Sequence, residues 1–205
     1  DIIGSLFLII LFSPLLVLIS IIIVLETGFP IIYKNERVGQ NDAMFFALKF
    51  RSMFKKDSTG AQFGRQGEKA LLKEQKLIDT QSIKSGPIYK IKNDPRVTGF
   101  GRFLRRWSLD ELPQFFNVLK GEMSLVGPRP HQPREVAGYH QQHKIVLAIK
   151  PGITGLSQIS GRSNLTYEEE INLDTFYIEN WSLPIDLIII TKTPFVVLTQ
   201  KGSVV

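Results

Sequence analysis

The feature that most constrains this chain is an apolar run without a single charge, from Ile2 to Leu25. As one straight helix the run would be about 36 Å long, whereas the hydrocarbon core of a bilayer is about 30 Å thick, so a transmembrane helix is one interpretation. Ser13 and Pro14 stand near its middle, and a proline inside a helix kinks it because the ring clashes with a carbonyl one turn back. Each half would then be about 18 Å long, too short to span. This favours a re-entrant helix over residues 1–26 that enters and leaves the membrane by one face.

Basic residues that follow the run set its expected orientation. Lys34 and Arg37 come soon after it, and Lys and Arg are retained on the cytoplasmic side of membranes. Residues 27–205 are therefore expected to form a membrane-associated domain on the cytoplasmic face. A second apolar stretch, 183–198, contains two prolines and two charged residues. It is too interrupted for another span, and it suits either an amphipathic helix in the membrane interface or a buried core helix.

Composition narrows the possible partners and sites. The 205 residues carry a net charge of +6, so nucleic acid, anionic lipid and phosphorylated small molecules are all compatible partners. The chain has no cysteine, which excludes disulfides and cysteine-based zinc sites. Neither a P-loop nor a G-x-G-x-x-G motif occurs. The first residue is Asp1 and no small-residue cleavage site follows the apolar run, so we expect a trimmed chain and no cleavable signal.

Beyond the apolar run, periodicity and turn residues predict a small, mostly helical α/β domain with one short β-hairpin. The hairpin strands are expected at 31–33 and 44–50, around a turn at 39–42. Helices are expected at 68–79, 98–107, 108–120, 134–149 and 166–180, with Gly121 closing the third of these. A loop is expected at 55–67, an irregular segment at 126–133 and a glycine-rich loop or strand at 151–161.

Two adjacent carboxylates, Asp110 and Glu111, lie just inside a predicted helix start. One interpretation is structural, because Ser108 and Glu111 have the spacing of a capping box in which the glutamate reaches back to the serine N–H. The other is functional. The positive end of a helix holds carboxylates ionised, an ionised aspartate can attack phosphorus, and a neighbouring glutamate can hold Mg²⁺. Pro113 limits where the first regular turn can begin, so the register of this helix start stays open.

Two groups of arginines flank the carboxylates. Arg102, Arg105 and Arg106 share one helical face, which suits either a solvated basic surface or a clamp for a diphosphate, since guanidinium groups bind phosphate oxygens in pairs. Arg129 stands between two prolines in the segment 127–130. Prolines on both sides restrict the backbone, so this segment is either a rigid surface turn or a rigid loop that presents one arginine to a phosphate.

Together these motifs resemble the bacterial sugar transferases, the monotopic polyprenyl phosphate phosphoglycosyl transferases. The resemblance rests on S-L-D-E-L-P-Q from Ser108 to Gln114, on N-V-L-K-G from Asn117 to Gly121 and on G-P-R-P from Gly127 to Pro130. Supporting matches are R-V-G at 37–39, K-F-R-S-M at 49–53 and P-G-I-T-G-L-S-Q-I-S-G-R at 151–162, and the apolar run with Ser13-Pro14 looks like the family's re-entrant helix. The segment 55–87 is longer than in the smallest members, so the chain is more similar to the catalytic core of the large ones.

The resemblance implies an enzyme of the bacterial inner membrane that moves a sugar 1-phosphate from a nucleotide diphosphate-sugar, such as a UDP-sugar, to undecaprenyl or another polyprenyl phosphate. UMP would leave and a covalent aspartyl phospho-sugar would form. Asp110 would be the nucleophile and Glu111 the ligand of a Mg²⁺ cofactor. The implied basic residues are Arg105, Arg129, Lys49 and Arg51 at the donor phosphates, and Arg162 facing the nucleotide or the sugar. Membrane lipid is a further implied partner, a homo-oligomer is compatible with the resemblance, and nucleic acid is not an implied partner.

Two other functions compete with this one. A basic domain that anchors an assembly to anionic lipid needs positive charge and an apolar segment, but it needs neither Asp110-Glu111 nor the 127–130 segment. A Mg²⁺-dependent hydrolase of nucleotide sugars would use water as acceptor and would not need a membrane segment. His140 and His143 have no evident third ligand, so we expect them to be solvent-exposed and not to bind a metal.

Overall fold

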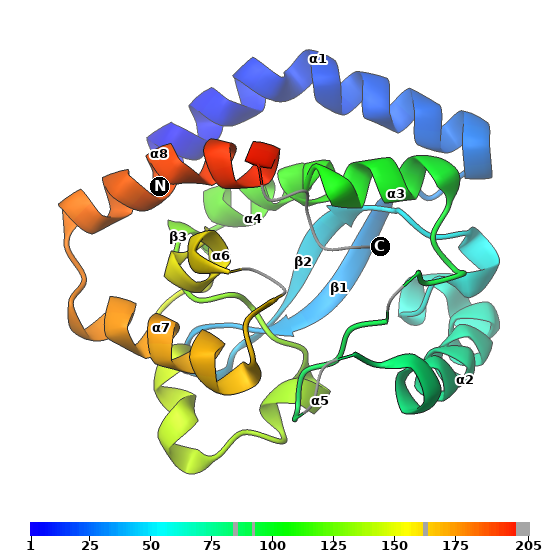
Figure 1. Cartoon of the computed structure of the whole chain (residues 1–205). Coiled ribbons are helices and arrows are strands. Elements are labelled where there is room, and N and C mark those ends of the chain that lie inside the picture. Colours follow the sequence, from blue (N-terminus) through cyan, green and yellow to red (C-terminus); the bar gives the residue numbers. More distant parts are fainter. Residues whose placement is uncertain (84–85, 92, 162–163, 200–205) are drawn as a thin grey trace.

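An antiparallel hairpin stands at the centre of the fold, and helices surround it. The computed structural model describes residues 1–83, 86–91, 93–161 and 164–199. Strands β1 (Ile32–Val38) and β2 (Met44–Phe50) pair in a register that places Ile32 opposite Phe50 and Val38 opposite Met44. Figure 1 shows this hairpin below the long helix α1 (Ile2–Thr27), with the other helices on both sides. The predicted hairpin is confirmed, and its first strand is longer than expected.

The remaining elements are mostly short helices, as the sequence predicted. Besides three short 3₁₀ turns at Gln40–Asp42, Lys55–Asp57 and Ala61–Phe63, they are, in chain order, α2 (Gly64–Gln81), α3 (Gly99–Arg106), the 3₁₀ helix η4 (Leu109–Gln114), α4 (Phe115–Leu119), β3 (Ser124–Val126), α5 (Pro133–Val136), the 3₁₀ helix η5 (Gln141–Leu147), β4 (Gly152–Thr154), α6 (Leu156–Ser160), α7 (Tyr167–Glu179) and α8 (Leu183–Thr199). Strands β3 and β4 pair in parallel. Hydroxyl caps explain two helix starts, because Thr98 Oγ1 accepts from the Gly101 N–H and Thr166 forms a capping box with Glu169.

Helix α1 is continuous but bent at mid-length, as the proline predicts (Figure 1). Pro14 has no N–H for the Ile10 carbonyl, and the hydroxyl of Ser13 donates to that carbonyl at 2.8 Å instead. The helix is long and apolar enough to cross a membrane. One side of it packs on the domain, because Ile19 and Ile23 form a core cluster with Phe50 and Leu104. Most of its other side chains are exposed.

Both ends of α1 are attached to the same domain. At the first end, the Asp1 carboxylate accepts hydrogen bonds from the Leu125 N–H at 2.9 Å and from the Ser124 hydroxyl at 3.0 Å. At the last end, the Glu26 carboxylate accepts from the Phe100 N–H at 3.1 Å. Figure 1 shows the helix lying over α3 and α4 between these attachments.

Two helix predictions were wrong in detail. The expected single helix at 108–120 is a 3₁₀ helix followed by a short α-helix, because Pro113 lacks the N–H that a continuous helix needs. The capping box at its start does not form, since Ser108 has a left-handed backbone with φ of 54° and makes no side-chain cap. The expected helix at 134–149 divides into α5 and η5 near Gly138, a residue that disfavours helix and packs closely on Pro87.

Candidate active site

A cavity of about 690 Å³ lies between the hairpin, the segment around η4 and the two apolar helices α1 and α8. Six of the seven candidate site residues line it: Lys49, Arg51, Arg105, Asp110, Glu111 and Arg129. The seventh, Arg162, lies outside the described residues. These side chains come from separate parts of the chain, so tertiary packing brings them together. The cavity is therefore the candidate active site.

Asp110 and Glu111 project from η4 toward strand β2. Lys49, on β2, forms an ion pair with Glu111 in which Nζ and Oε1 are 2.5 Å apart. Asp110 is buried. Burial raises the pKa of its carboxyl, the Lys49 ammonium opposes this rise, and the nearby Glu111 carboxylate adds to it. The expected stabilisation of the ionised form by a helix start does not prevail, because desolvation of this buried group outweighs it.

Arg105 is the only one of the three neighbouring arginines on α3 that lines the cavity. Its Nε donates to the Ser52 hydroxyl at 2.8 Å, which orients the guanidinium toward the cavity. Burial lowers the pKa of Arg105, and the carboxylates of Asp110 and Asp94 oppose this effect. Arg102 and Arg106 are exposed. The solvated-face interpretation thus holds for these two, and the phosphate-clamp interpretation applies only to Arg105.

Arg129 reaches the cavity because three glycines allow two backbone segments to meet. A Cβ on Gly152 would lie 2.1 Å from the Gly127 nitrogen, and a Cβ on Gly155 would lie 2.2 Å from the Gly127 carbonyl oxygen. The Gly127 N–H donates to Thr154 at 2.9 Å and the Gly152 N–H donates to Pro128 at 2.8 Å. The 127–130 segment is therefore fixed against β4 as well as by its own prolines.

The Arg129 guanidinium faces the cavity among several carboxylates. Burial alone would lower the pKa of Arg129, but the carboxylates of Glu111 and Glu170 and that of Glu135 raise it overall. Arg129 is an exposed residue and lines the cavity, so a ligand in the cavity can reach its guanidinium. Arg129 therefore offers a positive charge to an anion that binds in the cavity.

Arg51 lies differently from the other basic residues. It is only 2% exposed, and its Nη2 donates at 2.6 Å both to the Thr27 hydroxyl and to the Gly28 carbonyl at the end of α1. Its Nε and Nη1 have no hydrogen-bond partner among the described residues, although the side chain lines the cavity. One part of the guanidinium thus holds α1 to the domain, a contact that sequence reasoning did not anticipate.

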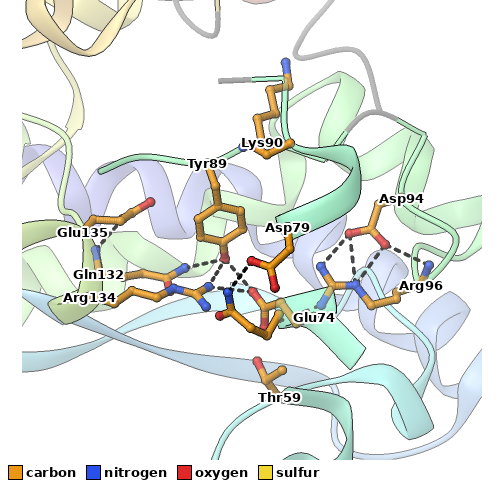
Figure 2. A network of polar contacts seen from close by, with 12 residues as sticks. Thr59, Glu74, Asp79, Tyr89, Lys90, Asp94, Arg96, Gln132, Arg134 and Glu135 are labelled. Carbon is orange, nitrogen blue, oxygen red and sulfur yellow. Dashed lines mark hydrogen bonds and ion pairs between the residues drawn. The ribbon is translucent and has the colours of Figure 1, made fainter. Parts of the chain in front are cut away.

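A polar network that the sequence did not predict forms part of the cavity wall, and Figure 2 shows its contacts. Its centre is Glu74 on α2, whose Oε1 accepts from the Tyr89 hydroxyl at 2.5 Å and from Arg134 Nη2 at 2.7 Å. Arg96 lies 3.5 Å from the other Glu74 oxygen and is itself held by Asp94. Burial alone would raise the pKa of Glu74, but hydrogen bonds from Tyr89 and Arg134 lower it overall. These contacts join α2 to α5, which carries Arg134, and to the segment between α2 and α3, which carries Tyr89 and Arg96.

Another part of the cavity wall is apolar. It includes Leu8 and Phe12 of α1, together with Ile190, Pro194 and Val197 of α8. Phe12 also stacks on Phe115 of α4, with ring centroids 6.4 Å apart. One cavity therefore connects a charged region around Asp110 with an apolar wall built by the two most hydrophobic helices.

The histidine prediction was half wrong. His140 is exposed as expected, but His143 is buried, and its Nδ1 hydrogen-bonds the Tyr167 hydroxyl at 2.8 Å. In the described part of the chain, no three or more histidine, aspartate or glutamate side chains are grouped so that they could hold a metal ion. The burial of His143 follows from the break between α5 and η5, which turns its side chain toward α7.

Comparison with known proteins agrees with these features. The profile of the family described as bacterial sugar transferase matches residues 1–200. The chain is 41% identical over 203 residues to the undecaprenyl-phosphate galactose phosphotransferase of Salmonella typhimurium, covering 99% of this chain and 40% of that protein. It is 40% identical over 215 residues to the UDP-glucose:undecaprenyl-phosphate glucose-1-phosphate transferase of Klebsiella pneumoniae, again covering 99% and 40%.

A shorter relative is matched over most of its length. The exopolysaccharide production protein ExoY of Rhizobium meliloti is 38% identical over 203 residues, which cover 99% of this chain and 85% of that protein. The chain thus spans about two fifths of the Salmonella and Klebsiella proteins and most of ExoY. With a family profile that matches almost from end to end, and with the motif residues gathered around one cavity, the chain belongs to the bacterial sugar transferase family.

Proposed function

We propose that this protein transfers a sugar 1-phosphate from a UDP-sugar to undecaprenyl phosphate or a similar polyprenyl phosphate. The observation that carries the proposal is the single cavity that joins the charged region around Asp110 to an apolar wall between α1 and α8. A water-soluble donor and a lipid acceptor need a site that offers both surfaces. The names of the Salmonella and Klebsiella relatives specify undecaprenyl phosphate, which supports the same class of acceptor.

Magnesium is the proposed cofactor, and the donor set in the cavity fits it. Mg²⁺ prefers oxygen ligands and commonly binds one or two carboxylates together with substrate phosphates and water. Asp110 and Glu111 supply adjacent carboxylates on the cavity wall, and we assign the ion to Glu111. Lys49 would have to release Glu111 Oε1, because an ammonium and a metal ion cannot share that position. When bound, the ion would neutralise phosphate oxygens and polarise the reacting phosphorus.

Asp110 is the proposed nucleophile. Its carboxylate would attack the phosphorus that bears the sugar, and the bond from that phosphorus to the bridging oxygen would break, so that UMP leaves. Arg105 and Arg129 would hold the phosphate oxygens and stabilise their developing charge. An oxygen of polyprenyl phosphate would then attack the same phosphorus. The bond to Asp110 would break, which gives the polyprenyl diphosphate-sugar and restores the carboxylate.

The position of α1 supports a re-entrant membrane helix. Its bend at Pro14 and the attachment of both ends to one domain suit a helix that enters and leaves the bilayer by the same face. The exposed side chains of α8, such as Leu187, Ile188 and Phe195, suit an apolar surface at the interface. The domain would then rest on the cytoplasmic face of the inner membrane, where the polyprenyl chain can enter the apolar end of the cavity.

The test is release of UMP from UDP-galactose or UDP-glucose, with and without undecaprenyl phosphate. We expect about one UMP per enzyme before lipid is added and continuous release afterwards, because the intermediate accumulates until an acceptor arrives. Intact-mass measurement with donor alone should show a phospho-sugar adduct on the parent and none on Asp110→Asn, whose fold should be unchanged. Continuous release without lipid would indicate a hydrolase. Sequential kinetics without an adduct would indicate direct attack by the lipid phosphate.

The metal assignment has its own test. Glu111→Gln keeps the size of the side chain and removes its charge, so we expect it to abolish Mg²⁺-dependent turnover. EDTA should have the same effect on the parent, and added Mg²⁺ should restore it. Turnover that survives either treatment would contradict the role of Glu111.

A further inference from the structure

Helix α6 presents two polar side chains to the cavity that none of the proposed steps uses. Ser157 and Gln158 both line the cavity, and Ser157 is only 2% exposed. Within residues 1–83, 86–91, 93–161 and 164–199, neither Ser157 Oγ nor Gln158 Oε1 has a hydrogen-bond partner. Buried polar atoms in native proteins nearly always have partners. Unsatisfied atoms on a cavity wall are therefore places where a ligand's own polar groups can bind.

The position of α6 beside the catalytic groups is fixed. Gln158 shares a small recess with Glu111, Lys49 and Arg129. Helix α6 begins directly after Gly155, which packs on Gly127 so closely that a Cβ would lie 2.2 Å from the Gly127 oxygen. The start of the helix therefore packs directly against the segment that carries Arg129. A group bound to Ser157 and Gln158 would lie next to a phosphate held by Arg129.

The chemistry of this pair suits hydroxyl groups better than charged groups. A serine hydroxyl and a glutamine amide are neutral, and each can donate and accept hydrogen bonds. A phosphate would favour the arginines, whereas a sugar hydroxyl also donates and accepts and so matches the pair. By contrast, the side chains of the polar network around Glu74 already bond to one another, because Tyr89 and Arg134 both donate to Glu74.

A carboxyl group stands behind the pair. Asp174 of α7 is 1% exposed, and within the described part of the chain neither of its oxygens has a hydrogen-bond partner. Asp174 lies close to the Ser157 hydroxyl and to the Arg129 backbone N–H without the geometry of a hydrogen bond, and both contacts partly oppose the effect of burial on the pKa of Asp174. A small rotation of the Ser157 hydroxyl would let it bridge Asp174 and a ligand.

We infer that Ser157 and Gln158 bind the hydroxyl groups of the donor's sugar and help to select which hexose is transferred. This inference rests on the proposed function, because the sugar can lie here only if its phosphate is held near Asp110 and Arg129. Glucose and galactose, the sugars in the names of the relatives, differ only in the configuration of one hydroxyl. A site that hydrogen-bonds hydroxyls can discriminate such a difference, whereas a purely apolar wall cannot.

The experiment measures binding separately from turnover. Titration calorimetry of Asp110→Asn with UDP-glucose, UDP-galactose and UDP gives the affinity with and without the sugar. Adding Ser157→Ala or Gln158→Leu should weaken binding of the preferred UDP-sugar by roughly three- to tenfold, the equivalent of one neutral hydrogen bond, and should leave UDP binding unchanged. In the otherwise unchanged enzyme, Gln158→Leu should also alter the ratio of kcat/KM for the two UDP-sugars.

Ser160→Ala is the matched control. Ser160 is exposed on the same helix and its hydroxyl bonds only to the Leu156 carbonyl among described residues, so its removal should change no affinity. Ser157→Ala should keep the melting temperature of its parent, and this measurement shows that a loss of affinity does not come from a failure to fold. Equal weakening of UDP and UDP-sugar, or no weakening at all, would overturn the inference. If Asp110→Asn and the parent both bind no UDP-sugar, the proposed function itself fails, and this result is separate from the other outcomes.

Discussion

At the scale of single residues, the charges around Asp110 oppose one another. Burial raises the pKa of this carboxyl, Lys49 and Arg105 lower it, and Glu111 raises it again. The proposed nucleophile has to be ionised to attack phosphorus. A cation that joins Glu111 would remove the like-charge repulsion and favour the ionised form of Asp110. The pair of carboxylates therefore suits a site that becomes reactive when donor and metal have bound.

Arg129 gives a direct test of phosphate binding. Arg129→Lys keeps the positive charge among the carboxylates but cannot make two parallel hydrogen bonds to a phosphate. We expect kcat/KM for the UDP-sugar to fall by roughly ten- to a hundredfold, or about 1.4 to 3 kcal/mol, with an unchanged melting temperature. Arg106→Lys, at an exposed position on α3, is the control and should be neutral. Unfolding of Arg129→Lys, with activity retained in the folded fraction, would instead assign Arg129 a structural role.

Asp174 predicts how stability depends on pH. Burial raises the pKa of this carboxyl to about 7. The folded state thus holds a proton that the unfolded state releases above its ordinary pKa of about 3.9. The free energy of unfolding should therefore fall as the pH rises from about 4 to about 7 and stay low above that. Asp174→Asn carries no such proton, so its stability relative to the parent should increase by about 1 to 3 kcal/mol between pH 5 and pH 8.

Urea unfolding at several pH values measures this effect. Asp79→Asn is the control, because Asp79 is exposed on α2 and bonds only to its neighbour Gln75 among the described side chains. The control should follow the parent at every pH. Parallel stability curves for Asp174→Asn and the parent would show that the folded protein does not hold this proton.

At the scale of elements, the site depends on how closely α3 approaches the end of β2. A Cβ on Gly101 would lie 2.0 Å from the Ser52 carbonyl oxygen, which no real contact allows. The hydroxyl of the same serine orients Arg105. A short contact between α3 and the backbone thus places an arginine in the cavity, and only glycine permits it.

Substitution at Gly101 tests this dependence. Gly101→Ala should force α3 away from Ser52 and lower the free energy of unfolding by about 1 to 3 kcal/mol or more. It should also reduce activity, because Arg105 would be displaced with the helix. Gly99→Ala is the matched control on the same helix, since its Cβ would meet only Glu26 at an ordinary 3.7 Å. Alanine favours helices, so this control should be neutral or slightly more stable. Equal effects of both substitutions on urea unfolding would contradict the close-contact explanation.

At the scale of the whole molecule, the cavity and α1 have to work at a membrane surface. Because both ends of α1 attach to one domain, we expect both ends on the same side of the bilayer. The chain contains no cysteine, so Ile3→Cys and Leu25→Cys each introduce a single label site at an exposed position. A membrane-impermeant maleimide should label both variants in inside-out vesicles and neither in right-side-out vesicles. Labelling from opposite sides would indicate a spanning helix.

Pro14→Ala sharpens the same test. The substitution supplies a backbone N–H at position 14 that can donate to the Ile10 carbonyl, and it removes the ring that forces the bend. A straight helix would be long enough to cross the bilayer, so Pro14→Ala should move one label site to the other side in part of the population. Ser20→Ala, which removes a hydroxyl bonded to Leu16 without changing the backbone, is the control and should keep the parent's labelling.

The sequence by itself determined the helical class of the domain, the central hairpin and the bend at Pro14, because each depends on neighbouring residues. Turn residues at 39–42 and the missing N–H of proline act locally, wherever the chain is. The sequence also identified the six candidate site residues that line the cavity, because the motifs that contain them are short contiguous runs. The family resemblance carried the assignment of their roles, which the proposed experiments test.

Only the tertiary structure decided which candidates lie in the cavity and which polar side chains are buried. Arg102, Arg105 and Arg106 share a helix face in the sequence, but contact with Ser52 brings only Arg105 inward. Glu74 looks like part of a solvated helix face until Tyr89 and Arg134 meet it from other segments, and His143 looks exposed until Tyr167 covers it. The raised pKa of Asp110 and the unpartnered hydroxyl of Ser157 arise in the same way. Burial depends on what the rest of the chain places around a residue, and no local pattern contains that information.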